Sequence, residues 1–225
     1  MSDRKRISRA TLATQLEDAL RVDIIEGLLR PGQRLRAADL TQYYGVSATP
    51  LREALQRLGA QNLVTIDPRM GATVAEISPG DLRDIYMLRE LLEVVALERS
   101  IAAAGDEWVQ RLTAAWEALR DLTNDASGAT TRTGALKWSS AHRAFHAALF
   151  DECGSPWLLR FIGTLAEHSE RYRMLARLPS RATLEEHEEL FRAATSFNIP
   201  RASAALRRHL AATVAVLEQA YPLAH

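Results

Sequence analysis

Four of the six histidines in the chain have a spacing that could hold a metal ion. His142 and His146 are four residues apart, so on a helix both side chains lie on one face, with Cβ atoms about 5–6 Å apart. His187 and His209 follow on two later segments of helical pattern. Imidazole is the commonest side-chain ligand for zinc and related metals, so these residues form a candidate metal site. From spacing alone, histidines with ordinary structural roles are the more common explanation.

The same histidines raise the alternative of a metal-dependent hydrolase. The zinc-protease motif needs a glutamate directly after its first histidine, because that carboxylate acts as the base. Arg143 follows His142 here. The sequence also has neither a glycine-rich phosphate loop nor a Gly-x-Ser-x-Gly elbow. We therefore expect that the protein is not an enzyme.

A second group of residues, within 40–74, could contact DNA. Gly45 suits a tight turn, and Pro50 suits the first turn of a following helix. Two β-prone triplets, at 64–66 and 72–74, come next and are joined by a turn. The order helix, turn, helix and two-strand ribbon is typical of a winged helix-turn-helix, a DNA-reading module.

The chemistry of DNA contact selects particular side chains in this module. A recognition helix presents its first turn to the major groove, where hydroxyls suit phosphates and a guanidinium suits guanine or phosphate. Residues at the wing tip could reach the adjacent backbone or minor groove. The candidate DNA-binding residues are Arg36, Ser47, Thr49, Arg52, Arg57, Arg69 and Gly71. The competing interpretation is a charged, solvated surface on a helical domain.

Several elements must position these residues. Apolar residues recur every four positions and predict a helix over 11–29: Leu12, Leu16, Leu20, Ile24 and Leu28. We expect further helices over 37–44 and 50–61, the second with Leu51, Ala54, Leu55 and Leu58 facing inward.

Everything after residue 78 has a helical pattern. The expected helices are 82–104, 107–122, 136–153, 156–178, 183–197 and 200–221. On the first of them, Leu82, Ile85, Leu88, Leu92, Val95 and Ile101 recur at helical intervals and are expected to face inward. The predicted fold class is mainly α, with a winged helix-turn-helix followed by an all-α six-helix bundle. The expected domains are 1–77 for DNA binding and 78–225 for effector binding and dimerisation.

Composition agrees with an ordinary globular protein. The 225 residues carry no net charge, and residues 1–77 hold 11 Lys/Arg against 9 Asp/Glu. Cys153 is the single cysteine, so an intrachain disulfide is impossible, which suits a reducing compartment. No signal peptide or membrane-spanning apolar run is visible, and we expect a soluble cytoplasmic protein.

The first domain resembles the GntR-type bacterial transcription regulators. The matching residues are Pro31-Gly32, Gly45-Val46-Ser47, the run Thr49 to Leu55, Arg57-Leu58 and the wing glycine Gly71. Many relatives have an arginine directly after the serine, where this chain has Ala48. The resemblance implies operator DNA as the partner, and Ala48 implies either an operator that differs from those of relatives or weaker base readout.

The second domain resembles the FadR-type carboxy-terminal domain, called FCD. The matching segments surround three of the four histidines: Phe145-His146 with Ala148-Leu149, Glu186-His187, and Ala204-Ala205 through His209-Leu210. Many relatives hold a metal through one aspartate and three histidines, and His142 occupies the aspartate position here. The resemblance implies a divalent metal ion, expected to be zinc or nickel, held by His142, His146, His187 and His209.

The resemblance also implies a small effector bound in the helical bundle. Arg89 and Glu93 match the Arg-x-x-x-Glu of the family's opening helix, and an arginine can bind a carboxylate through two hydrogen bonds. An intrahelical ion pair is the alternative for this pair. Arg171 is favoured over Arg173 as a further effector contact. We expect a homodimeric repressor that a small organic acid releases from DNA. A metal-dependent hydrolase and an effector-independent DNA-binding protein are the alternatives.

Overall fold

The computed structural model describes residues 11–124, 131–176 and 184–220 of the chain. The chain divides into two compact units, Met1–Ile77 and Ser78–His225. Among the described residues, helices long and apolar enough to cross a membrane are absent.

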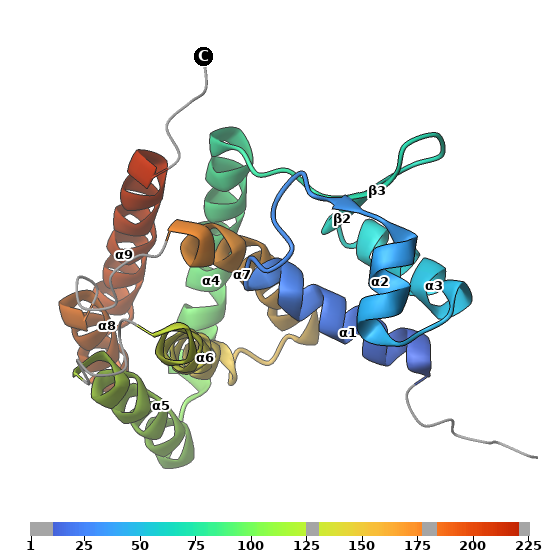
Figure 1. Ribbon diagram of the computed structural model, residues 1–225. Coiled ribbons are helices and arrows are strands. Elements are labelled where there is room, and N and C mark those ends of the chain that lie inside the picture. Colours follow the sequence, from blue (N-terminus) through green and yellow to red (C-terminus); the bar gives the residue numbers. More distant parts are fainter. Residues whose placement is uncertain (1–10, 125–130, 177–183, 221–225) are drawn as a thin grey trace, which may run out of the picture. The chain divides into compact units, whose positions relative to one another are not determined.

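The first unit is a three-helix domain with a small antiparallel sheet (Figure 1). Its elements are α1 Leu12–Ile25, β1 Arg34–Leu35, α2 Ala37–Tyr44, α3 Ala48–Ala60, β2 Val64–Asp67 and β3 Gly71–Val74. The strand order is β1-β3-β2, so β3 lies in the centre and pairs with both neighbours. Leu35 pairs with Ala72, and Val64 with Val74. The winged helix-turn-helix expected from the sequence is confirmed.

The leucine repeat of α1 only partly faces the core. Leu16, Leu20 and Ile24 are buried, whereas Leu12 and Leu28 are about half exposed. The apolar repeat that predicts the helix is therefore not one continuous buried stripe. A four-residue step rotates about 400° around an axis that turns 360° in 3.6 residues, so the stripe drifts about 40° per repeat. The helix also ends at Ile25 rather than Leu29.

The turn between α2 and α3 has the expected chemistry. Gly45 ends α2 in the left-handed conformation, with φ of 65°. α3 begins at Ala48, two residues earlier than predicted, and Ser47 lies at its N-cap without a side-chain capping hydrogen bond. Leu51 and Leu58 on its inner face are buried, as predicted.

The second unit consists of six described helices (Figure 1). They are α4 Pro79–Ala103, α5 Asp106–Asn124, α6 Arg132–Phe150, α7 Pro156–Ala176, α8 Leu184–Thr195 and α9 Ile199–Ala220. α4 packs against α7 and α9, α5 against α6, and α8 against α9. The all-α architecture is confirmed. The predicted helix ends at Leu178, Thr183 and Tyr221 lie outside the described residues.

α4 faces the bundle differently from the prediction. Leu88 and Val95 were expected to point inward, but their side chains are 41% and 45% exposed. Arg89 and Glu93 are buried in their place. A simple apolar periodicity misplaces this face because the inner side of α4 carries a buried ion pair among its apolar residues.

Candidate metal centre and nucleic-acid interface

The amino-terminal turn of α3 presents a set of polar side chains to solvent. Ser47, Thr49 and Arg52 are exposed there, as their predicted role in DNA contact requires. Arg36 is exposed at the N-cap of α2. Donors on one surface of a winged module can reach phosphates and base edges together.

A groove lies between the start of α2, α3 and the two strands β2 and β3. Its volume is about 790 Å³, and Arg34, Arg36 and Arg52 are the basic residues that line it. These arginines form no ion pair with a carboxylate of residues 11–124. Arg34 was not predicted as a site residue, because a two-residue strand such as β1 has no periodicity to mark it. The groove therefore offers three cationic groups to an anionic partner.

The tip of the wing is a turn built on Asp67. Its carboxylate accepts hydrogen bonds from the backbone amides of Arg69 (2.7 Å) and Met70 (2.8 Å). These two amides hold the pKa of Asp67 below its usual value. Gly71 has a φ of 87°, a conformation that side chains rarely adopt. The turn leaves Arg69 exposed at the tip, where the sequence placed a DNA contact.

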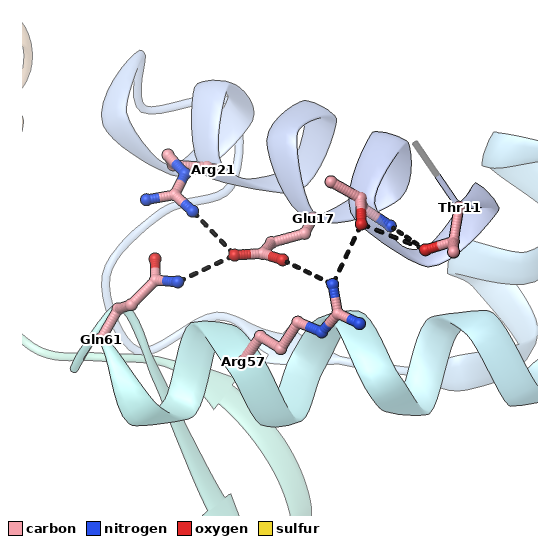
Figure 2. A network of polar contacts seen from close by, with 6 residues as sticks. Thr11, Glu17, Arg21, Arg57 and Gln61 are labelled. Atoms are coloured by element: carbon pink, nitrogen blue, oxygen red, sulfur yellow. Dashed lines mark hydrogen bonds and ion pairs between the residues drawn. The ribbon is translucent and has the colours of Figure 1, made fainter. Parts of the chain in front are cut away.

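Arg57 differs from the other predicted DNA-binding residues, because its guanidinium lies against α1 (Figure 2). It donates to Thr14 Oγ1 at 3.0 Å and pairs with Glu17 at 3.4 Å. The Glu17 carboxylate is buried and also accepts from Arg21 and Gln61, both at 2.8 Å. Arg57 therefore links α3 to α1, a contact that local sequence patterns do not reveal because Glu17 lies 40 residues away.

The structure brings the four predicted histidines together inside the second unit. His142 and His146 come from α6, His187 from α8 and His209 from α9, and all four are buried. One ring nitrogen of each lies within 4.8 Å of those of the others. His146 Nε2 and His187 Nε2 are 3.3 Å apart. The three helices thus turn four imidazoles toward a common point.

The surroundings of this cluster keep the rings of His142, His146 and His209 neutral. Burial, together with the charges of Arg173 and the neighbouring histidines, lowers the pKa of His142 and His146 well below the usual value. Burial and the charges of Arg173 and Arg89 lower the pKa of His209 to about 3. A neutral imidazole has a lone pair to give to a metal, whereas a protonated one has none.

Hydrogen bonding around the rings favours ligation. Glu186 accepts a hydrogen bond from His209 Nδ1 at 2.9 Å, which leaves His209 Nε2 with its lone pair. His142 Nε2 and His146 Nδ1 are buried and make no hydrogen bond within the described part of the chain. Buried polar atoms of this kind normally have partners. The donor set therefore fits a divalent ion of the kind that imidazole nitrogens bind.

Arg89 and Glu93 lie beside the cluster. Arg89 donates to Glu93 at 2.6 Å and to Ser169 at 3.0 Å, and both charged groups are buried. Burial is the largest single influence on the pKa of Arg89 and disfavours the cation, but the charges of Glu93, Tyr86 and Glu170 and the hydrogen bond to Glu93 together outweigh it and raise that pKa. The intrahelical ion pair is therefore present, and a permanent positive charge stands next to the histidines.

Arg173 is a second arginine near the histidines, whereas the sequence favoured Arg171 as the effector contact. Arg173 stacks over the ring of Trp138, 5.1 Å from its centroid, and its charge acts on three of the four histidines. Arg171 is buried on the same helix, and its charge acts on Tyr172. Periodicity alone does not fix which side of α7 meets the cluster, because all five residues 169–173 are buried.

Comparison with known proteins defines the class. Residues 12–74 match the model of the bacterial regulatory proteins of the gntR family, and residues 84–212 match that of the FCD domain. The chain therefore belongs to the GntR-family transcriptional regulators with an FCD domain.

Two similar proteins carry regulator names. The HTH-type transcriptional regulator BphR of Paraburkholderia xenovorans is 36% identical over 203 residues, which is 89% of this chain and 82% of BphR. The HTH-type transcriptional repressor GlaR of Escherichia coli is 33% identical over 208 residues, covering 89% of this chain and 93% of GlaR. These relatives are regulators of transcription, and the chain shares most of their length.

Solved structures share the fold. Escherichia coli McbR/YncC superimposes with a TM-score of 0.78 at 23% identity, over 95% of this chain and all of that one. A GntR transcriptional regulator from Rhodococcus sp. RHA1 gives 0.77 at 23% identity, over 93% and 98% of the two chains. At this identity the likeness concerns the fold alone.

Proposed function

We propose that the protein is a homodimeric repressor that binds an operator through its winged units and leaves it when a small organic acid binds beside a metal ion. The observation that carries this proposal is the buried cluster of four histidines, flanked by Arg89 and Arg173, in a chain that also has a DNA-reading unit. A sensory site and a reading unit in one chain are the two parts that ligand-controlled DNA binding needs.

The DNA contacts follow from the exposed donors of the first unit. Arg52 is the candidate for base readout in the major groove, and Ser47 and Thr49 suit phosphates at the helix amino terminus. Arg34 and Arg36 in the groove, and Arg69 with Gly71 at the wing tip, add contacts to the backbone. Ala48 has no side-chain donor, so base discrimination depends more heavily on Arg52.

The ligand site uses the second unit. A divalent ion held by the four imidazoles would supply a cation to which a carboxylate oxygen can bind. Arg89 and Arg173 stand close enough to the histidines to influence their charge, and each can donate two hydrogen bonds to a carboxylate. Both arginines already have an acidic partner, Glu93 and Glu170, so acid binding involves an exchange of partners.

An apolar face on the second unit supports dimerisation. It consists of Met87, Leu88, Leu91 and Val95 on α4 and Trp157 and Phe161 on α7, all 41% to 65% exposed. Contacts of Asp81 with Tyr172 and of Arg89 with Ser169 show that α4 and α7 pack antiparallel. This register brings the turn of Val95 level with that of Phe161. Two copies joined here would present two winged units to half-sites, which the simplest dimers read about 34 Å apart.

The test begins with DNA that the protein itself selects. Sites are enriched from a random duplex library with the full chain, and affinity for the enriched site is measured by fluorescence anisotropy. A panel of small mono- and dicarboxylic acids is then added to nickel- or zinc-loaded protein. We expect an enriched near-palindrome and at least one acid that lowers affinity by about tenfold.

Two results would overturn the proposal. One is the absence of any enriched sequence. The other is operator affinity that stays constant across the panel, which would favour an effector-independent DNA-binding protein. Turnover of an ester or amide substrate by the metal-loaded chain would instead favour the hydrolase alternative.

A further inference from the structure

The donor set of the candidate metal centre contains no carboxylate among the described residues. The group that could hold an ion is His142, His146, His187 and His209 alone. The acidic side chains nearby are bound elsewhere: Glu93 to Arg89, Glu170 to Ser139 and Arg173, and Glu186 to His209 Nδ1. An ion at this point would meet four neutral ligands.

His142 is positioned to be the fourth of these ligands. Its ring centroid lies 4.6 Å from that of His146, 4.9 Å from that of His187 and 6.3 Å from that of His209. The ring stacks on Trp138 at 4.8 Å with an interplanar angle of 20°, and this contact sets its orientation. Its Nε2 atom is buried without a hydrogen-bond partner in the described chain, so the ring has a nitrogen available for an ion.

We propose that His142 is a metal ligand and the residue that sets the metal preference of the site. This inference rests on the metal of the proposed function and concerns which ions the site accepts. Four imidazoles form a set of nitrogen donors of intermediate softness, which suits nickel, zinc, copper and cobalt. Manganese, magnesium and calcium prefer carboxylate, carbonyl and water oxygens, and no such protein ligand is offered here. The site therefore discriminates strongly against the oxygen-preferring ions.

The set of four neutral imidazole ligands also determines the net charge of the metal centre. A divalent ion keeps its full double positive charge when every protein ligand is neutral, whereas one carboxylate ligand would halve it. Arg89 and Arg173 add further positive charge nearby. The centre should consequently bind an anionic ligand more tightly with His142 than with an acidic residue in its place.

The test compares the wild-type full chain with H142D and H142A. Metal-free protein is titrated with Ni²⁺ and with Mn²⁺ by isothermal titration calorimetry, and the absorption spectrum of the Co²⁺ form reports the ligand set. We expect one ion per chain and Ni²⁺ affinity at least about 100-fold above that for Mn²⁺. H142D should narrow this ratio by about tenfold or more, and H142A should weaken Ni²⁺ binding by about tenfold or more. Both variants should change the Co²⁺ spectrum.

The control is H168D, because His168 lies on α7 outside the cluster. It should leave the Ni²⁺ to Mn²⁺ ratio and the Co²⁺ spectrum as in wild type. Circular dichroism shows whether each variant keeps its helical content. If H142D unfolds, H142A still tests the role of His142 in Ni²⁺ binding.

Two outcomes would overturn the inference: a wild-type chain that binds Mn²⁺ as tightly as Ni²⁺, or an unchanged ratio and spectrum in both folded His142 variants. In the second case acid-dependent release from the operator could still be observed, and only the role of His142 would fail. Conversely, selectivity that depends on His142 in a chain insensitive to every acid would leave this inference standing and remove the proposed function.

Discussion

Two arginines of α3, Arg52 and Arg57, have different structural environments. Arg52 and Arg57 both lie on the exposed side of α3. Arg52 makes no ion pair within residues 11–124, whereas Arg57 reaches α1 through Thr14 and Glu17. A guanidinium without an ion-pair partner in the protein can contact DNA at little energetic cost, whereas a paired guanidinium must first break its ion pair. The two residues should therefore respond to substitution in separable ways.

Replacing Arg52 by alanine should reduce operator affinity by about 5- to 100-fold, because one base or phosphate contact contributes about 1–3 kcal/mol. Arg57→Ala should instead lower the midpoint of unfolding and change operator affinity less. Anisotropy and chemical denaturation measure the two effects. Arg120→Ala, an exposed arginine of the second unit, is the control and should change neither. Equal losses of affinity for Arg52→Ala and Arg57→Ala would refute this division.

Arg89→Lys tests the acid site at the same scale. Lysine keeps the positive charge beside Glu93 but lacks the planar fork that binds a carboxylate through two bonds. Acid affinity should fall by about tenfold while metal content stays at the wild-type value. Calorimetry gives the first quantity and elemental mass spectrometry the second. Unchanged acid affinity would mean that Arg89 serves only its ion pair with Glu93.

At the scale of elements, α7 connects the histidine cluster to the start of α4. Ser169 and Arg173 of α7 lie on the side of the histidine cluster. Tyr172, between them in sequence, forms hydrogen bonds with residues at the start of α4. The Tyr172 hydroxyl contacts the backbone of Ser78 at 3.2 Å and the carboxylate of Asp81 at 2.6 Å. Burial and the Asp81 carboxylate raise the pKa of Tyr172, so its proton remains available for these bonds. A shift of α7 would therefore reach the first residue of the second unit.

Removing this hydroxyl should weaken the coupling between acid and DNA. Tyr172→Phe should keep metal content and operator affinity in the absence of acid, but the acid should lower that affinity several-fold less than in wild type. The control is Tyr86→Phe, because the buried Tyr86 hydroxyl has no hydrogen-bond partner in the described chain and its loss breaks no such contact. An acid response equal to wild type in Tyr172→Phe would exclude this route.

The element scale also shows where sequence patterns suffice. α2 matches its predicted bounds of 37–44, because Gly45 ends it by a local backbone requirement. β1 was missed, since two residues carry no alternation and the strand exists only through pairing with β3. All four histidines were identified as a candidate site from their spacing, and the family resemblance strengthened that hypothesis. The choice of Arg173 over Arg171 depends on the rotation of α7, which is fixed by packing and not by local pattern.

At the scale of the whole molecule, the exposed apolar residues of α4 explain a failed prediction. Leu88 and Val95 were assigned to the core because a periodic leucine has the same pattern whether it is covered by its own chain or by another. This exposed apolar face is where we propose that two copies associate. The sequence of a single chain does not distinguish apolar residues covered by that chain from those covered by a partner.

Leu91→Asp combined with Phe161→Asp should separate the copies. Two carboxylates in the apolar face would remain unpaired when buried, so the dimer constant should weaken by at least about 100-fold. Analytical ultracentrifugation measures the change, and affinity for a two-half-site operator should fall with it. Val216→Asp, another exposed apolar position on α9, should keep the wild-type assembly. A dimer that survives the double substitution would place the interface elsewhere.

Acid binding at the histidine centre is proposed to control DNA binding. The most direct measurement is operator affinity by anisotropy, with and without the acid found in the panel, for wild type and for a His146→Ala/His187→Ala variant. Both metal-loaded wild type and the variant should bind the operator when acid is absent, which shows that the first unit is intact. Acid should lower the affinity of wild type by about tenfold or more and leave that of the variant unchanged. If the acid released both proteins from the operator equally, with no metal bound to the variant, the histidine centre would not control DNA binding.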